Sequence, residues 1–246
     1  METTKLLKER FDLDIALLRI RRKKAGVDAA LRQAKFDLRE AQQAQILYGG
    51  SFKSFFDKLT GKQEEKEAAL RHAVQRSEAD LAAAMRSVSE AEENIRLLEK
   101  NLSMLPSWDT LKTAETAPVW YRLEALFCAE AVLPLLEINR LLLLERRNQL
   151  NGSNAGQIKT AYELADIITA PEKAGDDCKP YIMRLDAALT ALDMHLPACG
   201  YFHDPAAFLN TATKYARFDR LNEAIVQTES LLRHIPVLTQ QLQQDN

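Results

Sequence analysis

Residues 6–48 read LLKERFDLDIALLRIRRKKAGVDAALRQAKFDLREAQQAQILY and carry an apolar or aromatic residue at every seventh position. The first row of this repeat consists of Leu6, Leu13, Ile20, Val27, Ala34, Ala41 and Tyr48, and the second row holds Leu17, Leu31 and Leu38. Such a heptad seam is typical of a helix that packs against a partner helix. Arg10, Lys24 and Gln45 interrupt the second row, and a misaligned pairing would bury their polar heads. We therefore expect these three residues to fix the register of the seam.

The pattern repeats over residues 70–105. One row consists of Val74, Leu81, Val88, Ile95 and Leu102, and the other of Leu70, Ser77, Ala84, Ala91, Leu98 and Leu105. Only residues 49–62 separate the two patterns, and so short a connection forces the two helices to pair antiparallel. This pairing predicts that Leu13 lies near Leu98, within half a heptad. Pro106 should end the second helix, because its ring cannot continue a helix.

The composition of the chain favours the same fold class. Its 246 residues include only 8 Gly and 8 Pro, and 46% are hydrophobic. Scarce helix breakers leave long uninterrupted segments and exclude a β-sandwich or a glycine-rich nucleotide fold. We therefore predict an all-α protein, in which a long antiparallel coiled-coil hairpin over residues 1–106 precedes a compact helical domain over residues 107–246.

Proline, glycine and aromatic residues return after the hairpin and indicate shorter helices there. We expect a helix over about 119–150 that is kinked or split at Pro134, and a helix over 155–170 closed by Pro171. A third helix should cover about 180–195. Asp204 and Pro205 should open a fourth helix, and the last helix should end before Pro236. The polar tail after it should be frayed.

Charge and cysteine content bear on partners and compartment. The net charge is −2, and the basic run of residues 19–24 has no aromatic residues interleaved with it. We therefore expect no nucleic-acid partner. Three widely spaced cysteines, Cys128, Cys178 and Cys199, do not resemble a disulfide framework. The first residues lack the apolar core of a signal peptide, so we expect a soluble cytoplasmic protein.

The connection between the two heptad patterns, residues 49–62, reads GGSFKSFFDKLTGK. Its large apolar residues share one face at helical spacing, and lysines lie beside them. They can either fold back to close the end of the hairpin or stay exposed to contact a partner protein or a membrane. The predicted interaction tip consists of Phe52, Phe55, Phe56, Leu59, Lys58 and Lys62. It is not a phosphate-binding loop, because Phe56 and Gln63 stand where that motif needs glycine and serine or threonine.

The segment FFDKLTGKQEEKEAAL, residues 55–70, resembles the turn of uncharacterised bacterial coiled-coil hairpin proteins. In those proteins aromatic residues and an L-x-G-K sequence precede an acidic second arm. The resemblance covers the hairpin turn and implies a hairpin and a bacterial source. It carries over no activity and no functional residue.

One cluster in the second half could bear chemistry. His195, Cys199 and His203 are the candidate metal ligands, since imidazole and thiolate suit zinc. Pro197 and Gly200 interrupt the segment, so the spacing does not place the ligands on one helical face. A thiolate nucleophile at Cys199 would lack an identified orienting group. We therefore expect neither a metal site nor a cofactor.

These features leave three functional hypotheses. The favoured one is a non-enzymatic structural or adaptor protein whose coiled-coil stalk engages a protein partner or self-associates, for example as a homodimer. The second is a peripheral membrane protein that binds through the Phe-rich, basic tip. The third is a metal-dependent enzyme that uses His195, Cys199 and His203.

Overall fold

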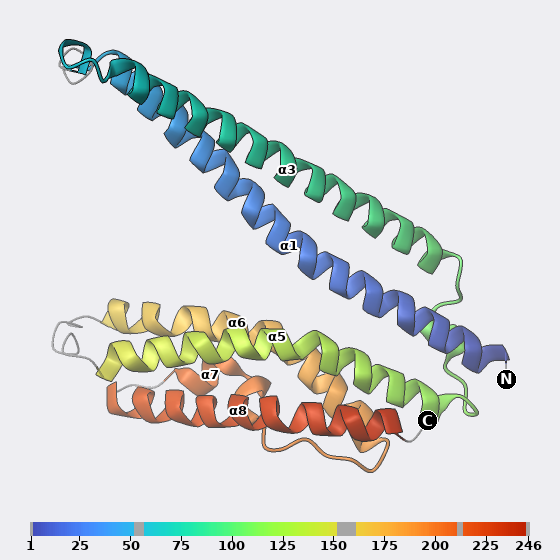
Figure 1. The fold of residues 1–246 in the computed structure, drawn as a ribbon. Helices are drawn as coiled ribbons and strands as arrows, with labels where there is room; N and C mark the ends of the chain where they lie inside the picture. The colour runs from blue at the N-terminus through green and yellow to red at the C-terminus, as the bar shows by residue number, and fades with distance from the viewer. Residues whose placement is uncertain (1, 52–56, 152–160, 211–213, 245–246) are drawn as a thin grey trace. The chain divides into compact units, whose positions relative to one another are not determined.

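The computed structural model describes residues 2–51, 57–151, 161–210 and 214–244, and Figure 1 shows these ranges as helices joined by short connections. The helices are α1 (Glu2–Gly49), α3 (Gln63–Ser103), α4 (Trp108–Leu111), α5 (Ala117–Asn151), α6 (Ala161–Thr190), α7 (Pro205–Leu209) and α8 (Lys214–Gln244), with a 3-10 turn η2 (Gly200–His203) between α6 and α7. No β-strand occurs in these ranges. The predicted all-α fold class is confirmed.

The heptad seams form the interface between α1 and α3. Of the residues in the predicted rows, Leu17, Ala34, Ala91 and Leu102 are buried, and all others except Gln45 are half-buried. Ion pairs bridge the helices: among the described residues, Arg21 Nη2 lies 2.7 Å from Glu99 Oε1, and Lys24 Nζ lies 3.3 Å from Glu92 Oε1. The residue numbers in these pairs run in opposite directions, so α1 and α3 are antiparallel.

Lys24 sits in the seam but keeps its charge outside it. Its Nζ contacts Asp28 Oδ2 at 2.9 Å as well as Glu92. A hydrogen bond to Asp28, then one to Glu92, raises the pKa of Lys24. The stem of the side chain lies along the seam while the ammonium reaches the surface. Carboxylates on α1 and α3 thus neutralise part of the basic run of residues 19–24.

The chain divides into two compact units, one over residues 12–105 and the other over residues 1–11 together with 106–246. The sequence-based boundary near residue 106 assigned the first eleven residues to the hairpin. Leu7 explains the difference, because its side chain is fully buried in a cluster with Leu111 and Leu123. Arg10, expected to fix the seam register, instead donates from Nη1 to the carbonyl of Pro106 at 2.8 Å.

The second unit is built around α5, which packs against both α6 and α8. Its core contains the fully buried side chains of Leu136, Leu143, Ile182, Leu189 and Leu221. The turn η2 and helix α7 contact both α6 and α8. As expected, Asp204 caps α7, since its Oδ1 accepts from the backbone N–H of Ala207 at 3.0 Å, and Pro205 takes the first helical position.

The predicted helix ends at Pro171 and before Pro236 are wrong, and α5 is not split at Pro134. Helix α5 runs through Pro134 without a break, and α8 continues through Pro236 to Gln244. Helix α6 contains both Pro171 and Pro180, so the two helices predicted on either side of Pro171 are one. An interior proline costs about 3 kcal/mol locally. Burial of one continuous apolar face offsets this cost, and in α6 that face includes Ala174, Cys178, Ile182 and Leu185.

A buried polar network surrounds the proline in α6. The Tyr201 hydroxyl donates to the carbonyl of Pro171 at 2.8 Å and accepts from Asn139 Nδ2 at 3.1 Å. Both side chains are fully buried. Gly175 lets Tyr201 approach the helix, because a Cβ at that position would stand 2.7 Å from the Tyr201 hydroxyl and 2.8 Å from Pro205 Cβ. The network therefore joins α5, α6 and η2 at one point.

We expect Gly175→Ala to destabilise the second unit by about 1–3 kcal/mol, although alanine favours helix more than glycine does. The added methyl must displace the Tyr201 ring or Pro205, and both are packed in the core. Thermal unfolding followed by circular dichroism measures the effect. Gly200→Ala is the matched control, since a Cβ there meets nothing within 4 Å. Equal melting temperatures for the two variants would contradict the assigned packing.

A second pair of variants tests the hairpin seam. Leu98→Asp should destabilise the hairpin by roughly 3 kcal/mol, because it places an unpaired charge in the seam. Arg21→Ala removes an exposed ion pair and should cost less than about 1 kcal/mol. Urea unfolding monitored by helix content measures both. Similar losses in the two variants would show that the seam assignment is wrong.

Candidate interaction site at the hairpin tip

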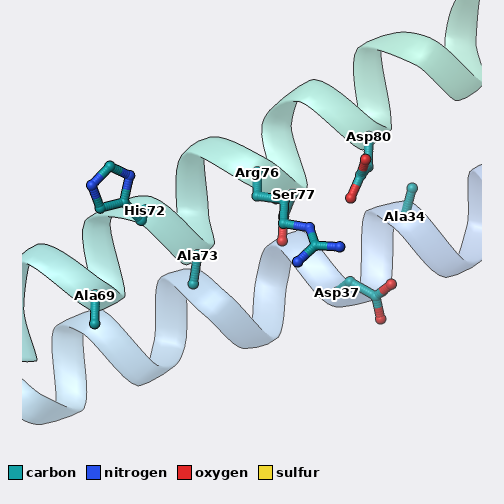
Figure 2. A pocket seen from close by; sticks show the side chains of 8 residues that line it. All are labelled: Ala34, Asp37, Ala69, His72, Ala73, Arg76, Ser77 and Asp80. Carbon is teal, nitrogen blue, oxygen red and sulfur yellow. The ribbon is translucent and has the colours of Figure 1, made fainter.

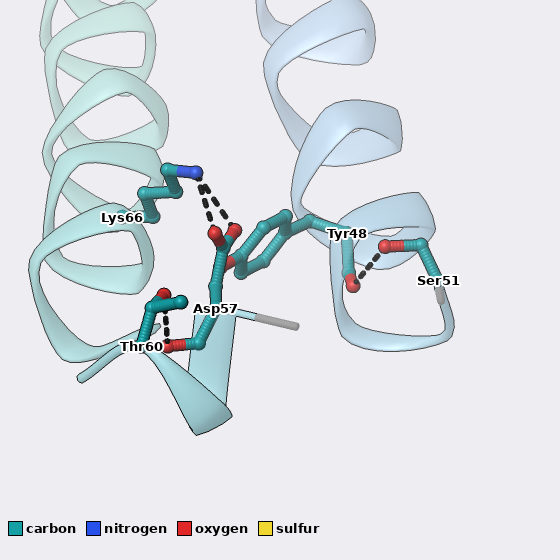
Figure 3. A network of polar contacts seen from close by, with 5 residues as sticks. All are labelled: Tyr48, Ser51, Asp57, Thr60 and Lys66. Carbon is teal, nitrogen blue, oxygen red and sulfur yellow. Dashed lines mark hydrogen bonds and ion pairs between the residues drawn. The ribbon is translucent and has the colours of Figure 1, made fainter. Parts of the chain in front are cut away.

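A buried carboxylate holds the end of the hairpin together. Asp57 is 8% exposed, and Lys66 Nζ lies 2.8 Å from each of its carboxylate oxygens. The Tyr48 hydroxyl donates to Asp57 Oδ2 at 2.9 Å. Figure 3 shows these side chains converging from the last turn of α1, the turn after it and the start of α3. We call Tyr48, Asp57 and Lys66 the tip clamp.

Local contacts to the backbone fix residues 57–62 and the end of α1 on either side of the clamp. The hydroxyl of Thr60 donates to the Asp57 carbonyl at 3.2 Å, and the Lys62 N–H donates to the same oxygen at 2.9 Å. Gly61 has a φ of 72°, a conformation that glycine adopts without steric cost. At the end of α1, Ser51 Oγ donates to the Tyr48 carbonyl at 3.0 Å. The path of the chain into α3 is therefore set by the segment's own residues.

The clamp changes the acidity of Tyr48. Partial burial raises the pKa of Tyr48 to about 12, with further contributions from its hydrogen bond to Asp57 and from the negative charges of Asp57 and Glu67. The neutral phenol donates a hydrogen bond to the carboxylate, whereas a phenolate would repel it. The clamp therefore requires a protonated Tyr48.

The predicted tip residues fall into two groups. Leu59 is 69% exposed, and Lys58 and Lys62 are also exposed. Phe52, Phe55 and Phe56 lie outside the described residues. Sequence reasoning missed two further exposed apolar residues, Ile46 at 74% and Leu47 at 72%, in the last turn of α1. Their positions outside both heptad rows were the signal that they face away from α3.

The charge at this end of the hairpin is mixed. Lys58 and Lys62 are followed by the exposed carboxylates Glu64 and Glu65 in the first turn of α3. Acidic residues in a first turn are favoured by the partial positive charge of the helix N-terminus. The exposed apolar groups of the tip are thus accompanied by both signs of charge.

A small hollow of about 230 Å³ opens between the helices next to the clamp. It is lined by Gln45, Tyr48, Gly49, Glu67, Leu70 and Arg71. Tyr48 belongs to both the hollow and the clamp. The clamp therefore shapes one wall of a depression that is large enough for a single side chain of a binding partner.

The candidate metal ligands do not form a complete site. Cys199 Sγ lies 3.7 Å from His203 Nε2, and His195 is exposed. Over the part of the chain that the structure describes, no group of three His, Cys, Asp or Glu side chains could hold a metal ion. Burial raises the pKa of the Cys199 thiol, with a smaller contribution from Asp186. This shift disfavours the thiolate that a nucleophile or a metal ligand needs.

The other two thiols lie in the core. Burial raises the pKa of Cys128 to about 12, and the nearby Glu124 adds to the shift. Burial also raises the pKa of Cys178 to about 12. Such thiols behave as small apolar side chains, so they contribute packing and not reactivity.

The pKa of Tyr48 predicts an alkaline loss of hairpin stability. Because the folded-state pKa of about 12 lies above the ordinary value of 10.0, the contribution of the clamp is fully present below pH 10. It is lost as the pH rises through about 12. Urea unfolding of the wild type and of Tyr48→Phe at a series of pH values measures how much the Tyr48 hydroxyl contributes to stability. The stability difference between them should shrink above pH 10, and a constant difference would contradict the role given to Tyr48.

Among the described residues, no helix has an apolar stretch long enough to cross a membrane. Comparison with known proteins adds no family assignment, since neither a protein-family model, nor a curated protein, nor a solved structure matches the chain. Functional inference therefore depends on the geometry of the chain itself.

Proposed function

We propose that this chain is a non-enzymatic structural or adaptor protein whose coiled-coil stalk presents the hairpin tip to a protein partner. The observation that carries the proposal is the tip clamp. It buries Asp57 and fixes this residue between α1 and α3, while Leu59, two residues later, stays 69% exposed.

Burial of a carboxylate is unfavourable unless hydrogen bonds and an opposite charge compensate for it. Lys66 and Tyr48 supply this compensation at Asp57. Fixing the backbone of residues 57–62 lowers the entropic cost of binding at Leu59, because this part of the surface is ordered before the partner arrives. The clamp thus supports a role in recognition for the tip.

The surface next to the clamp has the character of a contact site. Ile46, Leu47 and Leu59 are each more than two thirds exposed. Exposed large apolar groups near charged residues are characteristic of interaction surfaces. The hollow beside Tyr48 offers a place for an anchoring side chain of the partner.

Site-specific photo-crosslinking tests this proposal. A photoreactive phenylalanine analogue placed at Leu59 should capture a protein from a lysate of the source organism. The same analogue at Leu97, which is 48% exposed on α3, is the matched control and should not capture it. Lys66→Ala should lower the yield at position 59, because it releases Asp57 from the clamp. Equal adducts at both positions, or none at position 59, would refute the proposal.

A membrane surface is the second candidate for the tip. Leu59 lies between the exposed Lys58 and Lys62, a combination that can insert beside anionic headgroups. Glu64 and Glu65 oppose this interaction. Co-sedimentation with anionic and neutral vesicles, for the wild type and Leu59→Asp, separates the candidates. Binding of the wild type alone would favour the membrane, and no binding would remove it.

A further inference from the structure

A groove lies along one side of the hairpin between α1 and α3. Figure 2 shows its lining, which consists of Ala34, Asp37, Ala69, His72, Ala73, Arg76, Ser77 and Asp80. We call these residues the groove face. The groove has a volume of about 500 Å³. Ala69 and Ala73 are exposed although they lie on a helix that pairs with α1, so their short side chains leave the surface hollow.

Charged side chains on the groove face remain available for an external partner. Arg76 and Asp80 are exposed, and neither forms an ion pair within the described ranges. Asp37, across the groove from Arg76, accepts only from Gln33 Nε2 among the described contacts, at 2.7 Å. The face therefore combines unpaired positive and negative groups around an apolar floor. Such a surface is complementary to itself.

The seam of the hairpin is incompletely covered. Leu38, Leu70, Val74 and Leu81 are only half-buried in the isolated hairpin. In the second unit, by contrast, leucines such as Leu136 and Leu189 are fully buried by helices on more than one side. Two helices bury only a narrow seam, whereas four helices enclose a core on all sides. A second hairpin packed against this one would bury more of these side chains.

We infer that two copies of this chain pair through the groove face, so that the two hairpins form a four-helix coiled coil. A two-fold axis along the hairpin places α1 of one copy over α3 of the other. Arg76 of each copy then faces Asp37 of the other copy. The self-complementary charges select a second copy of this chain as the occupant. This pairing does not depend on the partner proposed for the tip.

Sedimentation equilibrium of the full chain tests the pairing. The wild type should approach twice the mass of the 27.8 kDa chain as the concentration rises. Ala73→Arg fills the groove and should give a monomer. Ala82→Arg is the matched control, because Ala82 is exposed on the opposite side of α3 and should leave the dimer intact. Circular dichroism checks that both variants keep the helix content of the wild type.

A charge exchange tests the assigned contact. Arg76→Asp should abolish the dimer through repulsion by Asp37 of the second copy, and addition of Asp37→Arg in the same chain should restore it. A wild type that is monomeric at all concentrations would overturn the inference. So would a dimer that survives Ala73→Arg, or a double variant that stays monomeric. Crosslinking at Leu59 is a separate readout, so failure of the tip proposal and failure of the pairing are distinguishable.

Discussion

The seam between α1 and α3 is the interaction on which the hairpin depends. The seam is narrow because only two helices enclose it, so most of its side chains are only half-buried, whereas the core leucines of a larger bundle are fully buried. Leu17, Ala34, Ala91 and Leu102 are buried, while the other seam residues keep some contact with water. Lys24 is tolerated in this seam because its ammonium reaches Asp28 and Glu92 at the edge. A narrow seam fixes direction and register but contributes limited stability, so the end of the hairpin needs its own fastening.

Different interactions stabilise the two units. In the second unit, burial from several sides dominates, and it carries α6 through two prolines and a glycine. In the hairpin, polar contacts supplement the narrow apolar seam, as the cross-helix ion pairs and the tip clamp illustrate. The contrast follows from geometry, since a two-helix ribbon has little interior in which apolar surface can be buried.

The sequence predicted the features that depend on long periodic patterns. Seven consecutive heptad positions from Leu6 to Tyr48 define α1, and the single interior glycine, Gly26, does not interrupt it. Helix ends in the second half were mispredicted because proline has a known local cost, whereas the compensating burial is visible only in three dimensions. Asp204 and Pro205 were predicted correctly because capping is a local interaction. The tip clamp was missed, since Asp57 and Lys66 are nine residues apart and only the turn brings them together.

The groove face and the tip would reinforce each other. An axis along the hairpin keeps both tips of a pair at the same end of the four-helix coiled coil. Two tips held at a fixed separation convert the second binding event into an intramolecular one. Among the described residues, each tip offers the exposed side chains of Ile46, Leu47 and Leu59 and a hollow of about 230 Å³, and a single contact to so small a surface would be weak. Pairing of the chain would then raise the apparent affinity for a repetitive or dimeric partner without any change in the tip itself.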